Sequence, residues 1–114
     1  MLADDAGFSR TALADALSAT PGIELVAVIA DGAALRDALA RLRPDILVID
    51  DRVLGRDRGL PRNAGPRVIV IGVDDDPAYA ARAVRAGAAA WVPKDRIDLL
   101  VAEILDPTIV WRST

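Results

Sequence analysis

The chain has 114 residues, 53% of them hydrophobic, and a formal net charge of −3; this length suits one compact domain, and the slightly acidic balance gives no reason to expect nucleic acid or an anionic membrane as a partner. It contains no cysteine, which excludes disulfides, thiol catalysis and thiolate metal sites. It also contains no histidine, which excludes a Ser-His-Asp triad and removes the commonest general base and zinc ligand.

The first forty-odd residues predict two strands and two helices. The short apolar run 1–3 fits a first strand, and residues 24–30 fit a second one. Residues 8–19 predict a helix capped by Asp5 or Ser9, from the helical spacing of Phe8, Ala12, Leu13, Ala16 and Leu17. Residues 33–42, closed by Pro44, predict a second helix with an apolar face made by Leu35, Ala38, Leu39 and Leu42.

The next stretch carries the most informative strand. Residues 46–49 are an unbroken aliphatic run, which predicts a strand buried on both faces, as at the centre of a parallel sheet. The run ends in Asp50 and Asp51. Because ligands of open α/β sheets bind just beyond the carboxyl ends of the strands, Asp50 stands where chemistry is expected. We expect Asp51 to be a solvated loop charge.

The segment 51–66 interrupts the alternation of strands and helices. Its glycines and prolines are too dense for a long helix, so we expect at most one helical turn, near residues 53–58. The segment is still long enough for a crossover between parallel strands, which takes about a dozen residues. A shortened helix would leave one sheet face thinly covered, and we therefore expect a homodimer or partner contact near this segment.

The last third of the chain restores the alternation. Residues 67–73 and 89–92 predict two more strands, and residues 77–86 predict a helix between them, which follows a cap in Asp74–Asp76 and stops at Gly87. Residues 96–105 predict a final helix with one strongly apolar face. The pattern predicts an α/β fold, a doubly wound parallel five-stranded sheet of order 2-1-3-4-5 whose third helix is short or missing. Residues 1–106 would form the domain, and residues 107–114 a C-terminal tail with Trp111.

Charged residues follow three of the predicted strands: Asp4 and Asp5 the first, Asp50 the third and Lys94 the fifth. In a 2-1-3-4-5 sheet the first and third strands flank the switch point, so the three carboxylates would converge in one crevice. Carboxylates this close raise one another's pKa unless a cation is present. A hard divalent ion such as Mg²⁺ fits such a site, and Lys94 supplies a further positive charge for an anion. The alternative, in which Asp4 and Asp5 only cap a helix, leaves Asp50 and Lys94 unexplained.

Four segments, in this order, resemble the CheY-like receiver domain of bacterial response regulators. They are Leu2-Ala3-Asp4-Asp5, the run from Pro44 to Asp50, Ala86-Gly87-Ala88, and Trp91-Val92-Pro93-Lys94-Asp95. Residues 31–45 and 86–95 look most like the receivers of LuxR/NarL-type regulators, whose output is a helix-turn-helix domain. The resemblance covers nearly the whole chain.

The resemblance implies two-component signal transduction, in which Asp50 takes a phosphoryl group from a histidine kinase. It implies that Asp5, Asp50 and the Arg52 backbone carbonyl hold Mg²⁺, that Asp4 acts through water, and that Lys94 contacts the phosphoryl oxygens. Phosphoryl transfer depends mostly on positioning and charge neutralisation, which these groups supply without any histidine in this chain. It implies a signalling domain rather than an enzyme, although receivers catalyse their own phosphorylation and dephosphorylation.

The chain departs from the family pattern at its switch positions, which marks it as an atypical receiver. The Ser or Thr usual at the end of the fourth strand is Gly72, Trp91 stands where Tyr or Phe is usual, and Leu54 replaces a Pro. Gly72 removes the hydroxyl that links the phosphoryl group to the switch. An arginine from residues 52–62 could also lie over the carboxylates in place of the metal. The domain would then be a phosphorylation-independent pseudoreceiver, acting in protein interaction or dimerisation.

A third alternative is a small hydrolase with an aspartyl nucleophile. That class needs a second acid two residues after the nucleophile, and Arg52 stands there, which argues against it. The partners we expect are a histidine kinase and a second copy of the chain, without direct binding of nucleic acid or membrane. No apolar stretch approaches the roughly 18 residues that span a bilayer, and no signal peptide is visible, so we expect a cytoplasmic protein.

Overall fold

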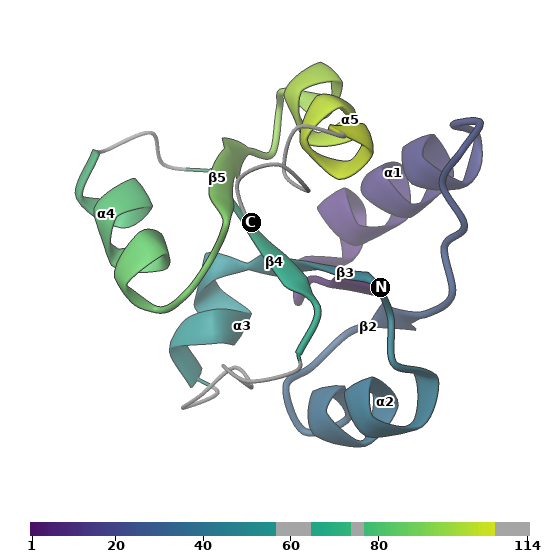
Figure 1. Cartoon of the computed structure of the whole chain (residues 1–114), viewed down its shortest axis with the longest axis horizontal. Coiled ribbons are helices and arrows are strands. Elements are labelled where there is room, and N and C mark those ends of the chain that lie inside the picture. Colours follow the sequence, from purple (N-terminus) through teal and green to yellow (C-terminus); the bar gives the residue numbers. More distant parts are fainter. Residues whose placement is uncertain (57–64, 74–76, 107–114) are drawn as a thin grey trace.

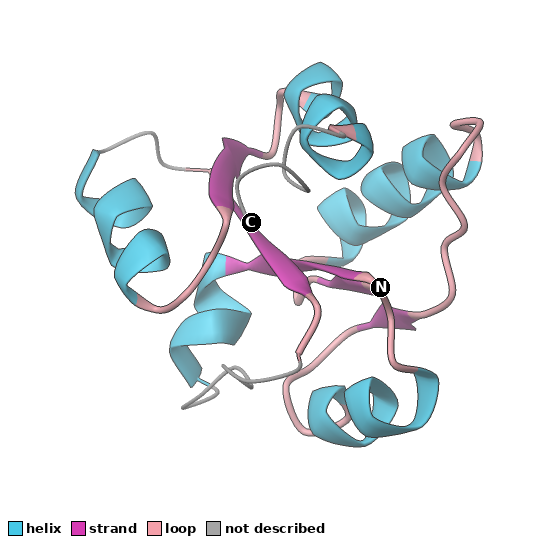
Figure 2. Cartoon of the chain, viewed as in Figure 1, coloured by secondary structure: helices cyan, strands magenta, loops and turns pink. Residues whose placement is uncertain are grey.

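The computed structural model describes residues 1–56, 65–73 and 77–106. Within these ranges strands and helices alternate throughout (Figures 1 and 2). The strands are β1 (Leu2–Ala3), β2 (Val28–Ile29), β3 (Ile46–Asp50), β4 (Arg67–Gly72) and β5 (Ala90–Pro93). The helices are α1 (Gly7–Ser18), α2 (Leu35–Leu42), α3 (Asp51–Arg56), α4 (Pro77–Arg85) and α5 (Ile97–Leu105). Among them, none has the length and apolar character that a bilayer span requires.

The five strands form one parallel sheet in the order β2-β1-β3-β4-β5, which confirms the predicted fold. β3 lies at its centre, where Leu47, Val48 and Ile49 are buried. Successive side chains of a strand point to opposite faces, so this run needs apolar neighbours on both sides. The order also brings the carboxyl ends of β1 and β3 side by side.

Helices supply those apolar neighbours on both faces. α1 and α5 cover one face, and α2, α3 and α4 cover the other (Figure 1). On the first face Leu13 of α1 and Leu100 of α5 pack around Val48. On the second face Leu35 of α2 and Val53 of α3 pack around Ile49. Each such side chain contributes about 1.5–3 kcal/mol when it is fully buried.

The third helix is short, as predicted. α3 has six residues and starts directly after β3, so that Val53 is buried against the sheet. Residues 57–64, which belong to the breaker-rich segment, lie outside the described residues. The aspartate cap expected at 74–76 and the tail with Trp111 also lie outside them.

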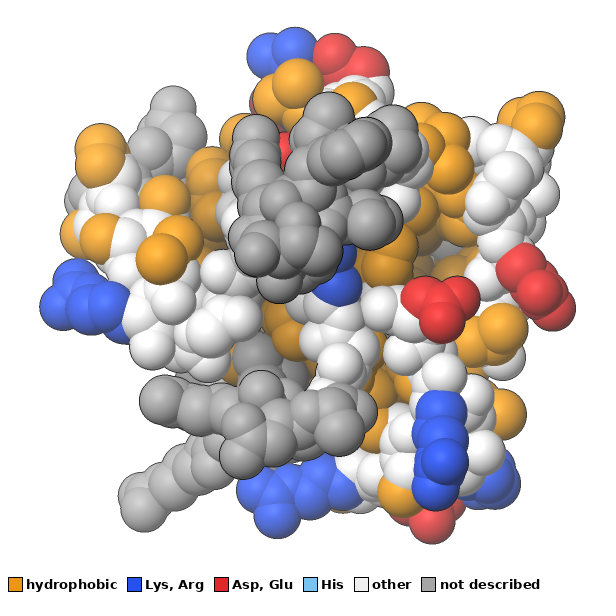
Figure 3. All heavy atoms as spheres, in the orientation of Figure 1, with side chains coloured by type: hydrophobic (Ala, Val, Ile, Leu, Met, Phe, Trp, Pro, Cys, Tyr) orange, Lys and Arg blue, Asp and Glu red, His pale blue; other side chains and the backbone are white. Residues whose placement is uncertain are grey.

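Three details of the predicted helices were wrong. Phe8, in the first turn of α1, is 94% exposed and does not belong to the core. Neither Asp5 nor Ser9 caps α1, whose N-cap residue is Ala6 without a side-chain cap hydrogen bond. Leu42 is partly exposed, since it ends α2 past the edge of the core. The opposite, exposed side of α2 carries charged side chains (Figure 3).

The second strand is much shorter than the predicted 24–30. β2 is an edge strand whose only neighbour in the described sheet is β1, itself two residues long, so little backbone is available for pairing. The hydrogen bonds from Leu2 N–H to the Ala27 carbonyl and from Asp4 N–H to the Ile29 carbonyl, both 3.0 Å, mark the extent of the pairing.

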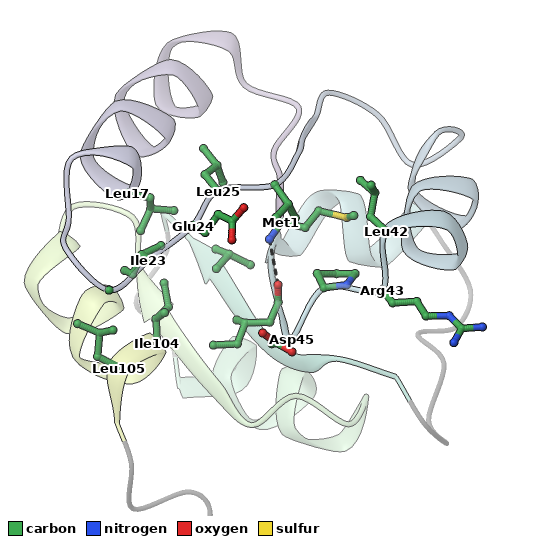
Figure 4. Close-up of a pocket in the computed structure, with 15 residues that line it drawn as sticks. Met1, Leu17, Ile23, Glu24, Leu25, Leu42, Arg43, Asp45, Ile104 and Leu105 are labelled. Carbon is green, nitrogen blue, oxygen red and sulfur yellow. Dashed lines mark hydrogen bonds between the residues drawn. The ribbon is translucent and has the colours of Figure 1, made fainter.

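A pocket of about 470 Å³ opens at the amino ends of the strands (Figure 4). Its walls are both polar and apolar, with Leu17, Ile23 and Leu105 beside Glu24, Arg43 and Asp45. At its edge the Met1 amino group donates a hydrogen bond of 3.0 Å to the Ile46 carbonyl. Burial lowers the pKa of this amino group, and the charge of Asp45 opposes that effect only in part.

Candidate functional site

Three carboxylates meet at the carboxyl ends of β1 and β3. One oxygen from each of Asp4, Asp5 and Asp50 lies within 4.8 Å of the others. Asp4 and Asp50 are 0% and 1% exposed, and the Asp5 side chain is 19% exposed. The convergence expected from the strand order is therefore observed, and it places three acids in a largely dry crevice.

Asp4 is fixed by hydrogen bonds to both of its oxygens. Oδ1 accepts from the Ala6 N–H at 3.0 Å and from Lys94 Nζ at 2.9 Å, and Oδ2 accepts from the Ser9 hydroxyl at 2.6 Å. Burial raises the pKa of Asp4, but the hydrogen bonds from Ser9, Lys94 and Ala6 outweigh it, and the pKa lies below its usual value. Asp4 is therefore ionised at neutral pH and held in one orientation.

Lys94 bridges Asp4 and Asp50. It directly follows β5, and its backbone N–H donates to the Gly72 carbonyl at 2.8 Å, which fixes the point from which its side chain extends. Its ammonium contacts Asp4 Oδ1 and forms a close ion pair with Asp50 Oδ2, and its side chain is 7% exposed. Burial alone would lower the pKa of Lys94, but hydrogen bonds to the two carboxylates raise it above its usual value. The site thus holds one permanent buried cation.

Arg52 lies on the other side of Asp50, in the first turn of α3. Its backbone N–H donates to Asp50 Oδ1 at 2.7 Å. Its side-chain Nε is 3.7 Å from Asp50 Oδ1 and 3.9 Å from Asp5 Oδ1. Because the side chain is 55% exposed, solvent weakens these ion pairs. The Arg52 guanidinium therefore lies beside the carboxylates of Asp5 and Asp50, as the pseudoreceiver alternative requires of one arginine.

Asp51 is not the solvated loop charge that we expected. It is half-buried against Gly72, where an added Cβ would lie 2.8 Å from Asp51 Oδ2 and 3.2 Å from Trp91 Nε1. Burial, the charge of Asp50 and a hydrogen bond with the Asp50 side chain raise the pKa of Asp51. The register could have revealed this neighbour, because β3 pairs Asp50 with Ile71 and so brings residues 51 and 72 together.

Comparison with known proteins identifies the family, although no family model matches the sequence. The chain is 35% identical over 101 residues to protein-glutamate methylesterase/protein-glutamine glutaminase 5 of Myxococcus xanthus, a match that covers 82% of this chain and 29% of that protein. It is 30% identical over 101 residues to the probable transcriptional regulatory protein NarL of Mycobacterium tuberculosis, covering 83% of this chain and 47% of that protein. The solved signal receiver domain of NarL from the same species superposes with a TM-score of 0.77 at 27% identity, covering 92% of this chain and 90% of that one.

This chain is a response-regulator receiver domain. The resemblance to NarL-type receivers is confirmed, and part of a protein-glutamate methylesterase is similar to this chain as well. The match covers less than half the length of each of these two curated relatives.

Sequence analysis missed one residue of the receiver's site. Ser9, assigned only to a helix cap, donates its hydroxyl to Asp4 Oδ2 and accepts from Lys94 Nζ at 3.1 Å. The Ser9 hydroxyl thus fixes the Asp4 carboxylate and the Lys94 ammonium relative to each other. A signal was available, because the first turn of the helix after β1 lies at the same edge of the sheet as the carboxylates.

The carboxylates fit a divalent cation. Their oxygens are the ligands that Mg²⁺ prefers, and they are close enough to share one ion after small side-chain adjustments. Both oxygens of Asp4 and both oxygens of Asp50 already contact donors, so an ion bound here would share or replace some of these contacts. The predicted Arg52 carbonyl lies in a helical turn, and helix carbonyls point toward the C-terminal end of the helix. Its role as a metal ligand stays a prediction.

Proposed function

We propose that this receiver takes a phosphoryl group on Asp50 from a histidine kinase, with Mg²⁺ bound, as the input step of two-component signalling. The observation that carries the proposal is the contact of Lys94 with Asp50 Oδ2 in a crevice shared with Asp4 and Asp5. A buried cation already touches the carboxylate that would become phosphorylated. It is therefore in place to neutralise charge on incoming phosphoryl oxygens.

The transfer needs little from the protein beyond position and charge. One Asp50 oxygen attacks the phosphorus atom, and a new P–O bond forms while the donor's P–N bond breaks. The electron pair of that bond leaves with the donor's histidine nitrogen, which takes a proton from solvent. Lys94 and the Arg52 N–H orient the Asp50 carboxylate, and Asp4 and Ser9 hold the Lys94 ammonium. Mg²⁺, held by Asp5 and Asp50 with Asp4 acting through water, would supply further charge neutralisation.

The test is phosphorylation by acetyl phosphate in the presence of Mg²⁺, followed by intact mass. We expect the wild-type chain to gain one phosphoryl group and Asp50→Asn to gain none. Asp51→Asn is the matched control, because it neutralises the adjacent acid and leaves Asp50 intact. Equal mass gain in wild type and Asp50→Asn would show that another residue is the acceptor.

Arg52 favours a second candidate, the phosphorylation-independent pseudoreceiver. Its guanidinium near Asp5 and Asp50, together with Lys94, gives two cations for three carboxylates without any metal. In this case Mg²⁺ would not raise the melting temperature of the wild type, and no phosphoryl group would be gained. Arg52→Ala would then create a response to Mg²⁺, because it uncovers the carboxylates.

The partners follow from the same proposal. A histidine kinase is the expected donor, and the setting is the cytoplasm. The receiver would act as a signalling domain and not as an enzyme on other substrates. A homodimer through residues 51–66 stays a prediction, and residues 57–64 of that segment lie outside the described residues.

A further inference from the structure

Asp51 occupies a niche that exists only because residue 72 has no side chain. The Gly72 backbone does not have a positive φ, so its conformation does not require glycine. An alanine there would place its Cβ 2.8 Å from Asp51 Oδ2 and 3.3 Å from Asp51 Cγ, closer than real contacts allow. The same Cβ would lie 3.2 Å from Trp91 Nε1. The Asp51 carboxyl group and the Trp91 indole thus face the same small space.

This position is electrostatically costly for Asp51. Its carboxyl group is half-buried beside Asp50, and the ion pairs of the crevice are formed with Asp4, Asp5 and Asp50. The charge and the backbone N–H of Arg52 favour the ionised Asp51, but burial and Asp50 outweigh them. Phosphorylation would replace the single negative charge of the Asp50 carboxylate by about two on the phosphoryl group, a net gain of about one beside Asp51. Lys94 would then be engaged by the phosphoryl oxygens. The niche over Gly72 would become strongly unfavourable for a second anion.

A second environment borders the same side chain. Asp51 also lines a pocket of about 530 Å³ between α3 and α4, together with Val70, Tyr79 and Arg82. The Arg82 guanidinium stacks over the Tyr79 ring at 4.6 Å from its centroid. Rotation of the Asp51 side chain would carry its charge away from Asp50 and toward this guanidinium.

We propose that Asp51 reports the phosphorylation of Asp50 by leaving the niche over Gly72 and turning toward Arg82 of α4. The inference rests on the proposed function. The signal is carried by repulsion: the new charge on Asp50 expels the Asp51 carboxylate, which empties the space beside the Trp91 indole and adds a negative charge to the wall of α4. Trp91 Nε1 is buried and has no hydrogen-bond partner within the described part of the chain, so its surroundings change directly when Asp51 moves.

The test combines intact mass with Trp91 fluorescence in a Trp111→Phe background, where Trp91 is the remaining tryptophan. Acetyl phosphate with Mg²⁺ is the probe; an Asp50 oxygen displaces acetate from phosphorus. We expect the parent chain to gain a phosphoryl group and shift its emission. Asp51→Asn should gain the group yet lose most of the shift, because the neutral amide is not expelled. Asp15→Asn, an exposed aspartate on α1, is the matched control and should keep both.

Gly72→Ala tests the niche without phosphorylation. Its Cβ forces Asp51 out, so the resting emission should already equal that of the phosphorylated parent. If this variant does not fold by circular dichroism, the double variant with Asp51→Ala should fold, because the clash is with that side chain. A double variant that stays unfolded would contradict the steric argument.

The possible failures are distinguishable. A phosphorylated Asp51→Asn with the full emission shift overturns the role of Asp51 and leaves the proposed function standing. So does a folded Gly72→Ala with the resting emission of the parent. Absence of any mass gain in the parent overturns the proposed function, and the displacement with it.

Discussion

The two ends of the sheet each bury an ammonium group, with opposite results. Lys94 at the carboxyl ends of the strands has a raised pKa, whereas the Met1 amino group at the amino ends has a lowered one. Burial lowers the pKa of both groups. Lys94 touches two carboxylates, but Met1 donates to a neutral carbonyl and feels the charge of an exposed Asp45.

The difference lies in the partners rather than in the depth of burial. A buried cation is stable where anions contact it directly, and it is poorly tolerated where only a dipole and a solvated charge are available. The carboxyl edge is therefore built to hold charge. At the amino edge the buried Met1 amino group has a carbonyl as its hydrogen-bond partner and no carboxylate in direct contact among the described residues.

Removing the cation at the carboxyl edge should have the largest effect. Lys94→Met leaves the buried Asp4 and Asp50 without their counter-ion, and we expect a loss of about 3–5 kcal/mol in the free energy of unfolding. Urea denaturation at pH 7 measures it. The control is Arg41→Met, which breaks an exposed ion pair with Asp37 and should cost about 0.5 kcal/mol. Equal losses in the two variants would refute the distinction between the edges.

A substitution beside the amino-edge pocket should have an intermediate effect. Gly22 has φ +90°, and an added Cβ would contact Leu105 Cδ2 at 3.4 Å. Gly22→Ala should cost about 1–2 kcal/mol, because a side chain in the left-handed region is strained. Gly87→Ala is matched, with φ +102° and nothing within 4 Å of the new Cβ. Similar melting temperatures for the two variants would assign the whole cost to the backbone.

The dependence of the unfolding free energy on pH should be the smallest effect. Its sign differs between the Met1 amino group and Lys94, because their pKa values shift in opposite directions. The folded Met1 amino group has a pKa below its usual 8.0, so the unfolded chain binds more protons, and stability should rise as pH increases toward 8. The Lys94 contribution is fully present below 10.5 and is lost only as pH rises through its raised folded value. Unfolding free energies between pH 6 and 9 should therefore increase slightly, and N-terminal acetylation should abolish the increase. A decrease over this range would contradict the assignment.

At the acid end Asp4 gives a pH dependence of the same sign as Met1, with stability lost as pH falls. The pKa of Asp4 is depressed in the folded chain, so its contribution is fully present above 3.8 and is lost as pH falls through the lower folded value. The same urea series extended to pH 2 measures this loss. In Lys94→Met the loss should be smaller, because one of the bonds that depresses the pKa of Asp4 is gone.

The sheet and the carboxylate cluster were predictable because they depend on patterns that are local in sequence. The aliphatic run 46–49 predicts a central strand, and the alternation of strands and helices predicts a parallel doubly wound sheet, for which 2-1-3-4-5 is a common strand order. Once the order is assumed, Asp4, Asp5 and Asp50 must meet. The convergence of these carboxylates depends on which strands are neighbours in the sheet and not on how their side chains pack.

The errors concern features that depend on neighbours distant in sequence. The length of β2 depends on how much of β1 is available to pair with it. The exposure of Phe8 depends on where α1 begins relative to the sheet edge. The niche of Asp51 depends on the register of β3 against β4, which no local pattern encodes. The place of Ser9 in the first turn after β1 could have been noticed in the sequence, but its bonds to Asp4 and Lys94 depend on the geometry of that turn.

The position of β1 has a consequence for the order of folding. This two-residue strand lies between β2 and β3, and Leu2 pairs with both Val28 and Val48. The chain must lose loop-closure entropy to bring both partner strands to β1 before pairing with them stabilises it. β3, β4 and β5, in contrast, can pair with one another in chain order. We expect β1 to join the sheet late. The folding φ-value, the ratio of the change in activation free energy to the change in stability, should be near 0 for Leu2→Ala and higher for Val70→Ala in β4. The acidic crevice, which needs Asp4, would then be assembled in the last stage of folding, on a sheet that already exists.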